Sequence, residues 1–255
     1  MTYAHDSRDD AEGLGPEPAS VHELLAIRAG GLGDVVRAVP ALRHLRATFV
    51  DARISVVASQ AGRALLDTCP YVDRTIALER PSEALLERFD VALSFAHPGE
   101  QSRLSLKVID AGMRVGWRLG RESGRRAIRP LWPERLDDRS RMLRLAWLLG
   151  GALHADPGLG LWPSLADRNG AARLVADTQR PLAIIHVGSG SSQRRWPAAR
   201  WARVLDLIDG IGLEPVLVGT SEDQSIVDQV VASVRHAPMS LLGKTNVGEL
   251  VGLLE

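Results

Sequence analysis

The chain has very little cysteine: Cys69 is the only one among its 255 residues. No disulfide can therefore form within the chain, which is typical of a protein kept in a reducing compartment. The chain also lacks any apolar run near the roughly 18 residues that a membrane-spanning helix requires, and its acidic, polar N-terminus has no signal-peptide pattern. From these absences we expect a cytoplasmic protein.

An excess of charge of either sign is absent as well. The chain carries 31 basic and 31 acidic residues, so its formal net charge is zero and nothing in its composition indicates a nucleic-acid partner. No spacing of His, Cys and Asp suggests a metal site. Cys69 has no Cys–His signature around it, and we expect it to be a buried apolar residue.

Apolar runs of strand length alternate with segments of helical spacing over most of the chain. This alternation predicts an α/β fold with parallel sheets, and it occurs in two arrays that a Gly- and Pro-rich segment separates. Two Rossmann-like lobes facing a cleft are therefore predicted. The expected divisions are a disordered tail over 1–20, a first lobe over 21–155, an interdomain linker over 156–180 and a second lobe over 181–255.

The predicted elements follow from the periodicity of the apolar residues. Strands are expected at 23–28, 53–59, 72–78, 91–95, 181–187, 214–218 and 240–242. Helices are expected at 35–48, 62–68, 82–88, 138–149, 198–208, 221–234 and 247–254. Pro40 falls within the first of these helices, where it fits an early turn or a kink.

A glycine turn, Gly30-Gly31-Leu32-Gly33-Asp34, joins the first strand to the first helix. Such a turn brings backbone N–H groups and a helix N-terminus to the edge of the sheet where α/β proteins bind ligands. It lacks the third small residue of a dinucleotide fingerprint and the Gly-Lys-Ser/Thr of a P-loop. Its one carboxylate, Asp34, is either a simple helix cap or a catalytic group at that edge.

Segments 27–28, 31–36 and 40–42 resemble the N-terminus of the bacterial heptosyltransferase family, glycosyltransferase family 9. Further matching pieces follow in the same order, at 71–73, 89–90, 114–117, 186–190, 194–197, 217–222 and 242–245. This resemblance implies a GT-B fold and transfer of a heptose, with inversion, from an ADP-sugar donor to a lipopolysaccharide-core or similar glycan acceptor. It also implies that neither a metal nor another cofactor is required.

The resemblance assigns roles to particular residues. Asp34 matches the family's proposed general base, which takes the proton of the attacking acceptor hydroxyl. Arg194 aligns with a family lysine that contacts the donor phosphates, and Glu222 matches an acid near the donor nucleoside. Hydroxyls of the second-lobe turn are also candidates for binding the diphosphate; they belong to Ser189, Ser191 and Ser192. For each of the donor-side residues, the alternative is a purely structural role, as an exposed loop residue or as a residue in the first turn of a helix. His186 is expected to be a satisfied strand-end histidine.

The acceptor side is expected in the first lobe. Its candidate residues are Gly31, Gly33, His97, Arg118 and Arg121. Arg118 and Arg121 belong to an arginine-rich stretch from Arg114 to Arg129, which could bind a phosphorylated acceptor or the anionic inner face of the membrane. A solvated arginine-rich loop is the alternative reading.

The resemblance departs from the family pattern at the end of the chain. The family's second lobe continues with an Asp-x-Gly-Pro-x-His type segment that cradles the donor diphosphate, whereas this sequence stops at Glu255. We therefore expect an incomplete second lobe and weak or no turnover. Two alternatives stay open: an inactive relative that binds a glycan or nucleotide, and a GT-B enzyme that uses a different nucleotide sugar.

Overall fold

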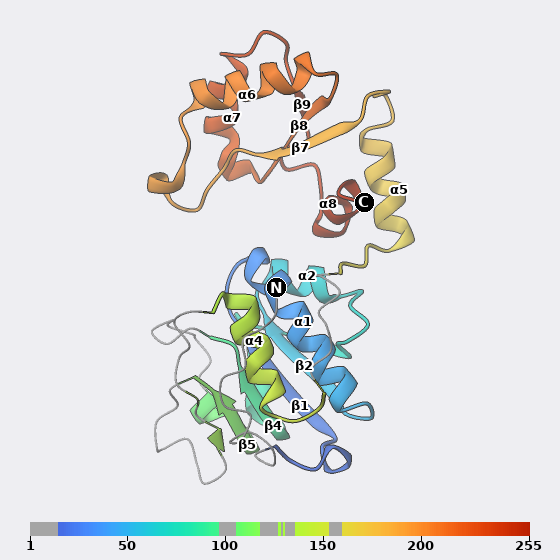
Figure 1. The fold of residues 1–255 in the computed structure, drawn as a ribbon, viewed down its shortest axis with the longest axis vertical. Coiled ribbons are helices and arrows are strands. Elements are labelled where there is room, and N and C mark those ends of the chain that lie inside the picture. The colour runs from blue at the N-terminus through green and yellow to red at the C-terminus, as the bar shows by residue number, and fades with distance from the viewer. Residues whose placement is uncertain (1–14, 97–105, 118–126, 129, 131–135, 153–159) are drawn as a thin grey trace. The chain divides into compact units, whose positions relative to one another are not determined.

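The computed structural model describes residues 15–96, 106–117, 127–128, 130, 136–152 and 160–255 (Figure 1). The chain divides into two compact units, Met1–Leu161 and Trp162–Glu255. Residues 15–20, expected to belong to a disordered tail, are structured: Pro18–Ser20 forms a 3₁₀ turn, η1, in which the Ser20 hydroxyl donates to the Glu17 carbonyl at 2.7 Å. Proline early in the turn already has the φ that this turn needs.

The first unit is built on a parallel sheet with the strand order β3-β2-β1-β4-β5-β6. Its strands are β1 (Glu23–Arg28), β2 (Arg53–Ala58), β3 (Arg74–Ala77), β4 (Arg88–Ser94), β5 (Asp110–Gly116) and β6 (Ala127–Ile128). The central strands are almost continuously buried, as strands covered on both faces must be. The first strand, β1, therefore ends in the middle of the sheet edge.

Four α-helices accompany this sheet in the described residues: α1 (Leu32–Thr48), α2 (Gln60–Leu66), α3 (Ser82–Leu86) and α4 (Asp138–Trp147), with a short 3₁₀ helix, η2 (Leu106–Val108). Helix α1 begins three residues before its predicted start, directly at the glycine turn. Pro40 lies buried within α1, which continues past it to Thr48. Helices α1 and α4 pack side by side, so the N-terminal turns of both can contribute to one cluster of side chains (Figure 1).

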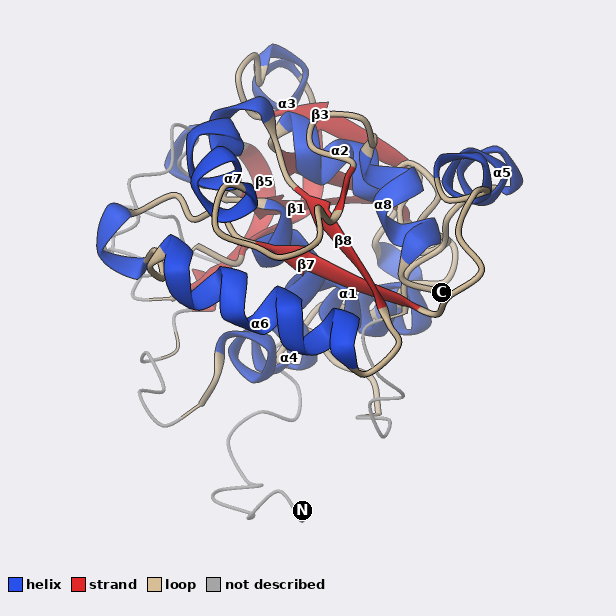
Figure 2. Ribbon diagram, turned by 90° about the horizontal axis from the view of Figure 1, so that it is seen from above, coloured by secondary structure: helices blue, strands red, loops and turns tan. Residues whose placement is uncertain are grey.

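The second unit holds a three-stranded parallel sheet with the order β7-β8-β9. Its strands are β7 (Leu182–His186), β8 (Glu214–Val218) and β9 (Met239–Ser240), and its helices are α5 (Leu165–Leu174), η4 (Ser192–Arg194), α6 (Ala198–Gly210), η5 (Ser221–Asp223), α7 (Gln224–Val231) and α8 (Val247–Leu253). Alternate strand residues point to opposite faces. Leu217 packs with α6 and α7, whereas Val216 packs with residues of α5 and α8 (Figure 2).

The segment predicted as a linker, 156–180, contains helix α5 and is largely part of the second unit. Ser164 and Asp167 form a capping box that starts this helix, a signal outweighed in the sequence by the surrounding glycines and prolines. Helix α5 packs tightly on α8: a Cβ added at Gly170 would lie 2.4 Å from Oε1 of Glu249. Residues 153–159 lie outside the described part of the chain.

Within the described residues, no helix is long and apolar enough to cross a bilayer. The single cysteine, Cys69, is buried as expected. Burial raises the pKa of its thiol, although a backbone hydrogen bond from Tyr71 and the charge of Arg43 act in the opposite direction. The thiol therefore has the character of an apolar core group.

Candidate functional site

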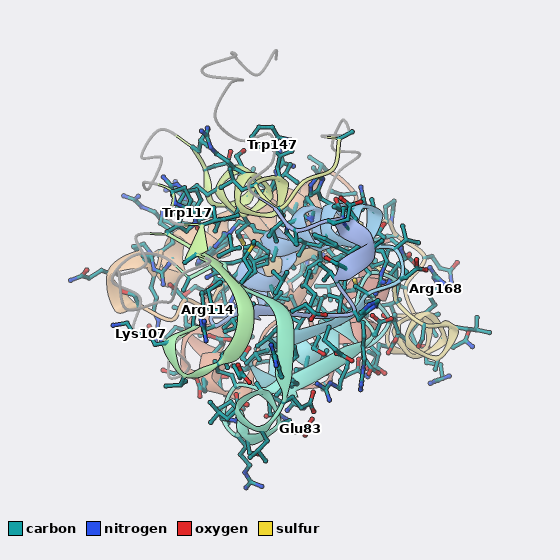
Figure 3. All side chains as sticks on the ribbon, turned by 90° about the horizontal axis from the view of Figure 1, so that it is seen from below. Glu83, Lys107, Arg114, Trp117, Trp147 and Arg168 are labelled. Carbon is teal, nitrogen blue, oxygen red and sulfur yellow. The ribbon has the colours of Figure 1, made fainter. Side chains whose placement is uncertain are left out.

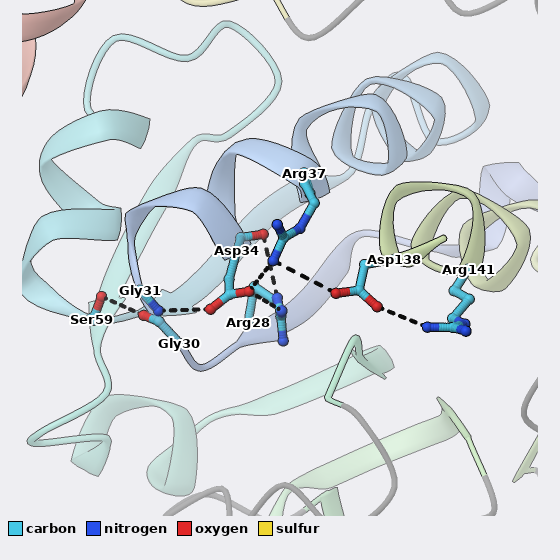
Figure 4. Close-up of polar contacts among 8 residues, drawn as sticks. All are labelled: Arg28, Gly30, Gly31, Asp34, Arg37, Ser59, Asp138 and Arg141. Atoms are coloured by element: carbon cyan, nitrogen blue, oxygen red, sulfur yellow. Dashed lines mark hydrogen bonds and ion pairs between the residues drawn. The ribbon is translucent and has the colours of Figure 1, made fainter. Parts of the chain in front are cut away.

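The β1–α1 turn places a carboxylate at the carboxyl end of the central strand. Gly30 adopts a φ of +131°, a conformation that residues with a Cβ avoid. A Cβ at Gly30 would lie only 2.5 Å from Oδ2 of Asp34. The glycine thus allows the carboxylate to fold back over the turn (Figure 4).

Among the described residues, three N–H bearing groups contact the Asp34 carboxylate. The Gly31 backbone N–H donates to Oδ2 at 2.9 Å, which caps the start of α1. Nη2 of Arg28 lies 2.9 Å from Oδ1, and Nη2 of Arg37 donates to the same oxygen at 2.5 Å. These contacts occupy Oδ1 twice and Oδ2 once, and a carboxylate offers about four acceptor positions in all. A further position on Oδ2 can therefore receive the proton of a hydroxyl.

The two arginines differ in their surroundings. The side chain of Arg28 comes from the end of buried strand β1 and is only 7% exposed, whereas that of Arg37, one turn along α1, is 44% exposed. The Asp34 side chain is 29% exposed, so solvent reaches it. Helix α1 also directs the partial positive charge of its N-terminus at this carboxylate. The site combines a reachable carboxylate with a positively charged surround.

A second carboxylate from α4 extends this cluster. Oδ2 of Asp138 lies 3.6 Å from Nη2 of Arg37, and Oδ1 of Asp138 accepts from Nη1 of Arg141 at 2.9 Å (Figure 4). Asp137, the N-cap of α4, accepts from the Ser140 backbone N–H at 3.0 Å. That hydrogen bond, opposed by partial burial, holds the pKa of Asp137 below its usual value. Asp138 was not singled out by the sequence, because no local motif connects it with the glycine turn.

The structure brings Gly31 and Gly33 to the same turn as Asp34, but it does not test their role toward an acceptor. Gly33 lies in the first turn of α1, and a Cβ there would meet nothing within 4 Å. His97, Arg118 and Arg121 lie outside the described residues. Arg114, labelled in Figure 3, lies at the start of the arginine-rich stretch. It donates to the backbone carbonyls of Leu106, Ile109 and Ala111. It thus fixes the entry to β5.

The second unit presents the predicted serine turn after β7. Oγ of Ser189 accepts from the Ser191 backbone N–H at 3.3 Å, and Nε of Arg195 donates to the Ser189 carbonyl at 3.3 Å. Arg194 ends the short helix η4 and is exposed. The side chain of Ser192 lies outside the described part of the structure. An exposed guanidinium group and half-buried serine hydroxyls at the end of a parallel strand are suited to a phosphate ligand.

Two neighbouring acids after β8 have different environments. Glu222, the predicted donor contact, is exposed, whereas Asp223 is only 8% exposed and was missed by sequence analysis. Oδ2 of Asp223 accepts from the Thr220 N–H at 3.1 Å and from its hydroxyl at 3.3 Å. A Cβ added at Gly188 would lie 1.9 Å from Oδ1 of Asp223. The carboxylate therefore joins the loops after β7 and β8, and the Thr-x-x-Asp spacing was the available signal.

His186 is the last residue of β7. Its Nδ1 lies 3.1 Å from the Val218 carbonyl, so this ring has a hydrogen-bond partner on the neighbouring strand, in agreement with expectation. Among the described residues, no three His, Cys, Asp or Glu side chains are grouped so that they could hold a metal ion. That transfer needs no metal stays a prediction.

Comparison with protein families gives a match in the later part of the chain. Residues 139–255 match the model of glycosyltransferase family 9 (heptosyltransferase). This match covers the second unit and the end of the first, and it agrees with the resemblance seen in the sequence. A search of curated proteins by sequence gives no match.

Solved structures of similar fold include glycosyltransferases. A family 9 glycosyl transferase from Veillonella parvula superposes with a TM-score of 0.81 at 20% identity, over 95% of this chain and 74% of that one. E. coli ADP-heptose LPS heptosyltransferase II superposes with a TM-score of 0.72 at 22% identity, over 91% of this chain and 76% of that one. E. coli heptosyltransferase WaaC with ADP superposes with a TM-score of 0.62 at 13% identity, over 86% of this chain and 73% of that one. These likenesses show the GT-B type α/β fold predicted from the sequence, and together with the family match they support a glycosyltransferase.

Proposed function

We propose that this protein is a glycosyltransferase of family 9 that moves a heptose, or a similar sugar, from an ADP-sugar to a lipopolysaccharide-core or other cell-envelope glycan, with inversion. Asp34 is the general base. The observation that carries this proposal is the position of Asp34, a solvent-reachable carboxylate at the carboxyl end of β1, where α/β sheets bind ligands. One acceptor position of its Oδ2 is available for the proton that the attacking hydroxyl loses.

The donor is proposed to bind the loops that follow β7 and β8. Arg194 and the hydroxyls of Ser189, Ser191 and Ser192 would hold the diphosphate, and Glu222 would contact the nucleoside. Because the leaving diphosphate carries the developing charge, guanidinium and N–H groups can stabilise it without a metal or other cofactor. Structures of similar fold hold ADP and ADP-2-deoxy-2-fluoro heptose in E. coli WaaC, which supports an ADP-linked donor.

The acceptor is proposed to bind the first unit, at Gly31 and Gly33 and through His97, Arg118 and Arg121. Arg118 and Arg121 belong to a stretch of basic residues suited to phosphate groups on a glycolipid or to an anionic membrane surface. We therefore propose a cytoplasmic enzyme that contacts the inner membrane peripherally, with no nucleic-acid partner.

The first experiment is calorimetric titration of ADP, GDP and UDP into the full chain. We expect ADP-selective binding, weakened by Arg194→Gln and unchanged by Asp34→Asn. Transfer from ADP-heptose to a deacylated lipopolysaccharide-core acceptor is then followed by mass spectrometry. Asp34→Asn should abolish transfer while ADP binding persists. Selective binding of GDP or UDP would indicate another nucleotide sugar, and ADP binding without transfer would indicate a binding protein.

A further inference from the structure

We propose that the outer face of helix α6, in the second unit, docks on an anionic lipid surface. This outer face consists of Arg200, Arg203, Val204, Leu207 and Ile211. It lies apart in the sequence from the loops proposed to bind the donor, and it belongs to a different unit from the arginine-rich stretch. The inference therefore goes beyond the proposed function and does not depend on it.

The two faces of α6 have different surroundings. The inner face packs on the second sheet, where Leu205 and Ile208 join the apolar cluster that includes Leu217 of β8 (Figure 2). At 3.6 residues per turn, the five residues of the outer face lie within about 100° of one another around the helix axis. Their arc is on the side of the helix away from Leu205, so it is not used for packing on the sheet.

Large apolar side chains on the outer face are left in water. Leu207 is 69% exposed, and Ile211, about one turn later, is 74% exposed. Val204 is half-buried beside them. Trp196 is 39% exposed and packs edge-on against Trp201 in the first turn of α6, with ring centroids 5.1 Å apart. Single exposed apolar residues are normal on a protein surface, but here they recur at helical spacing along one face.

The charge on the outer face is positive. Arg200 and Arg203 are both exposed, and neither side chain pairs with an acid among the described residues. The acids of α6 are paired with arginines outside the helix, as Asp206–Arg235 and Asp209–Arg180. The two guanidinium groups of the outer face therefore keep their charge available for an external anion.

Exposed aliphatic side chains together with unpaired arginines are typical of a helix that lies in the interface of an anionic membrane. The aliphatic groups enter the acyl boundary, while the long arginine side chains reach the lipid phosphates. A second copy of this chain is a poorer partner. A two-fold contact between two such faces would bring the arginines of both copies together without an acid between them.

The test is sedimentation of the full chain with vesicles of phosphatidylglycerol and phosphatidylethanolamine, or of phosphatidylcholine alone. We expect binding to the anionic vesicles only, weakened by salt because charges at a surface are screened. Arg200→Gln combined with Arg203→Gln should weaken binding about 25-fold, since each arginine near an anionic surface contributes about fivefold. Leu207→Gln combined with Ile211→Gln should weaken it about tenfold or more, because less apolar surface is buried. Vesicle binding needs no donor and no sugar transfer, so its outcome is independent of the proposed activity.

Two exposed residues of α5 give matched controls in the same unit. Leu165 is 72% exposed, and Arg173 is exposed without an ion pair to a described residue. Leu165→Gln and Arg173→Gln make the same chemical changes and should leave vesicle binding unchanged. All the substituted side chains lie at the surface, so circular dichroism should show an intact fold for every variant.

A fluorophore sensitive to its environment, attached at Leu207→Cys, gives a second readout, because the native Cys69 is buried. Its emission should move to shorter wavelength with anionic vesicles, whereas the same fluorophore at Leu165→Cys should show no change.

The proposal is overturned if the wild type does not bind anionic vesicles, or if the α6 variants bind them as tightly as the wild type. Equal weakening by the α5 controls would overturn it as well. A doubling of the mass at high protein concentration that Leu207→Gln with Ile211→Gln abolishes, without lipid binding, would instead make this face a contact between two copies.

Discussion

Replacing Gly30 by alanine should distort the β1–α1 turn and destabilise the protein. At a φ of +131° a residue with a Cβ is strained by about 1–3 kcal/mol. The new Cβ would also lie 2.5 Å from Oδ2 of Asp34 and 3.0 Å from its Cβ and Cγ. Relief requires the carboxylate to leave the Gly31 N–H, which costs about 1 kcal/mol as a lost helix cap. We expect a total loss of about 2–4 kcal/mol in the free energy of unfolding.

The assay is urea unfolding followed by far-ultraviolet circular dichroism, with Gly33→Ala as the matched control. A Cβ at Gly33 meets nothing within 4 Å and lies in a helix, where alanine is favoured over glycine by about 0.5–1 kcal/mol. The control should therefore be as stable as the wild type or more stable. Gly30→Ala should also lower kcat, because the new Cβ displaces the carboxylate of Asp34. Equal stabilities of the two variants would refute the reasoning.

Three further predictions concern other parts of the chain. Gly188→Ala should weaken ADP binding at least tenfold, because the new Cβ would lie 1.9 Å from Asp223 and displace it. Gly210→Ala, whose Cβ would meet nothing within 4 Å, should leave ADP binding unchanged. Equal affinities of the two variants, measured by calorimetry, would contradict this. Burial raises the pKa of Asp90, but backbone hydrogen bonds from Glu23 and His22 lower it by more. The free energy of unfolding, measured with urea at each pH, should therefore fall as the pH drops below about 4. It should fall less steeply in Asp90→Asn. Cys69 should resist Ellman's reagent in the native state and react in concentrated guanidinium chloride; rapid native labelling would show that its surroundings open.

The sequence contained enough local information to predict the part of the site that surrounds Asp34 in the first unit. A buried apolar strand, a run of glycines and a helical pattern together determine where Asp34 lies, because all three signals are adjacent in the chain. The parallel arrangement of both sheets followed from the same alternation. The beginning of α1 was misplaced by three residues, since Leu32 and Gly33 read as turn residues rather than as a first helical turn.

The parts that could not be predicted depend on tertiary contacts. Asp138 reaches Arg37 only because α4 packs on α1, and no periodicity encodes that pairing. Glu222 and Asp223 both occupy the start of a helix, and the space left by Gly188 is what distinguishes the buried acid from the exposed one. Helix α5 was missed because its capping residues stand among glycines and prolines.

The packing of α5 on α8 has a consequence for biosynthesis. Arg168 on α5 pairs with Glu255, and these two residues are 87 positions apart in the chain. At roughly 5–20 residues per second, a ribosome needs about 4–17 s to synthesise the intervening segment. During that interval the face of α5 that α8 later covers has no partner from this pair. The contact between α5 and α8 therefore forms only after the segment between them has been synthesised.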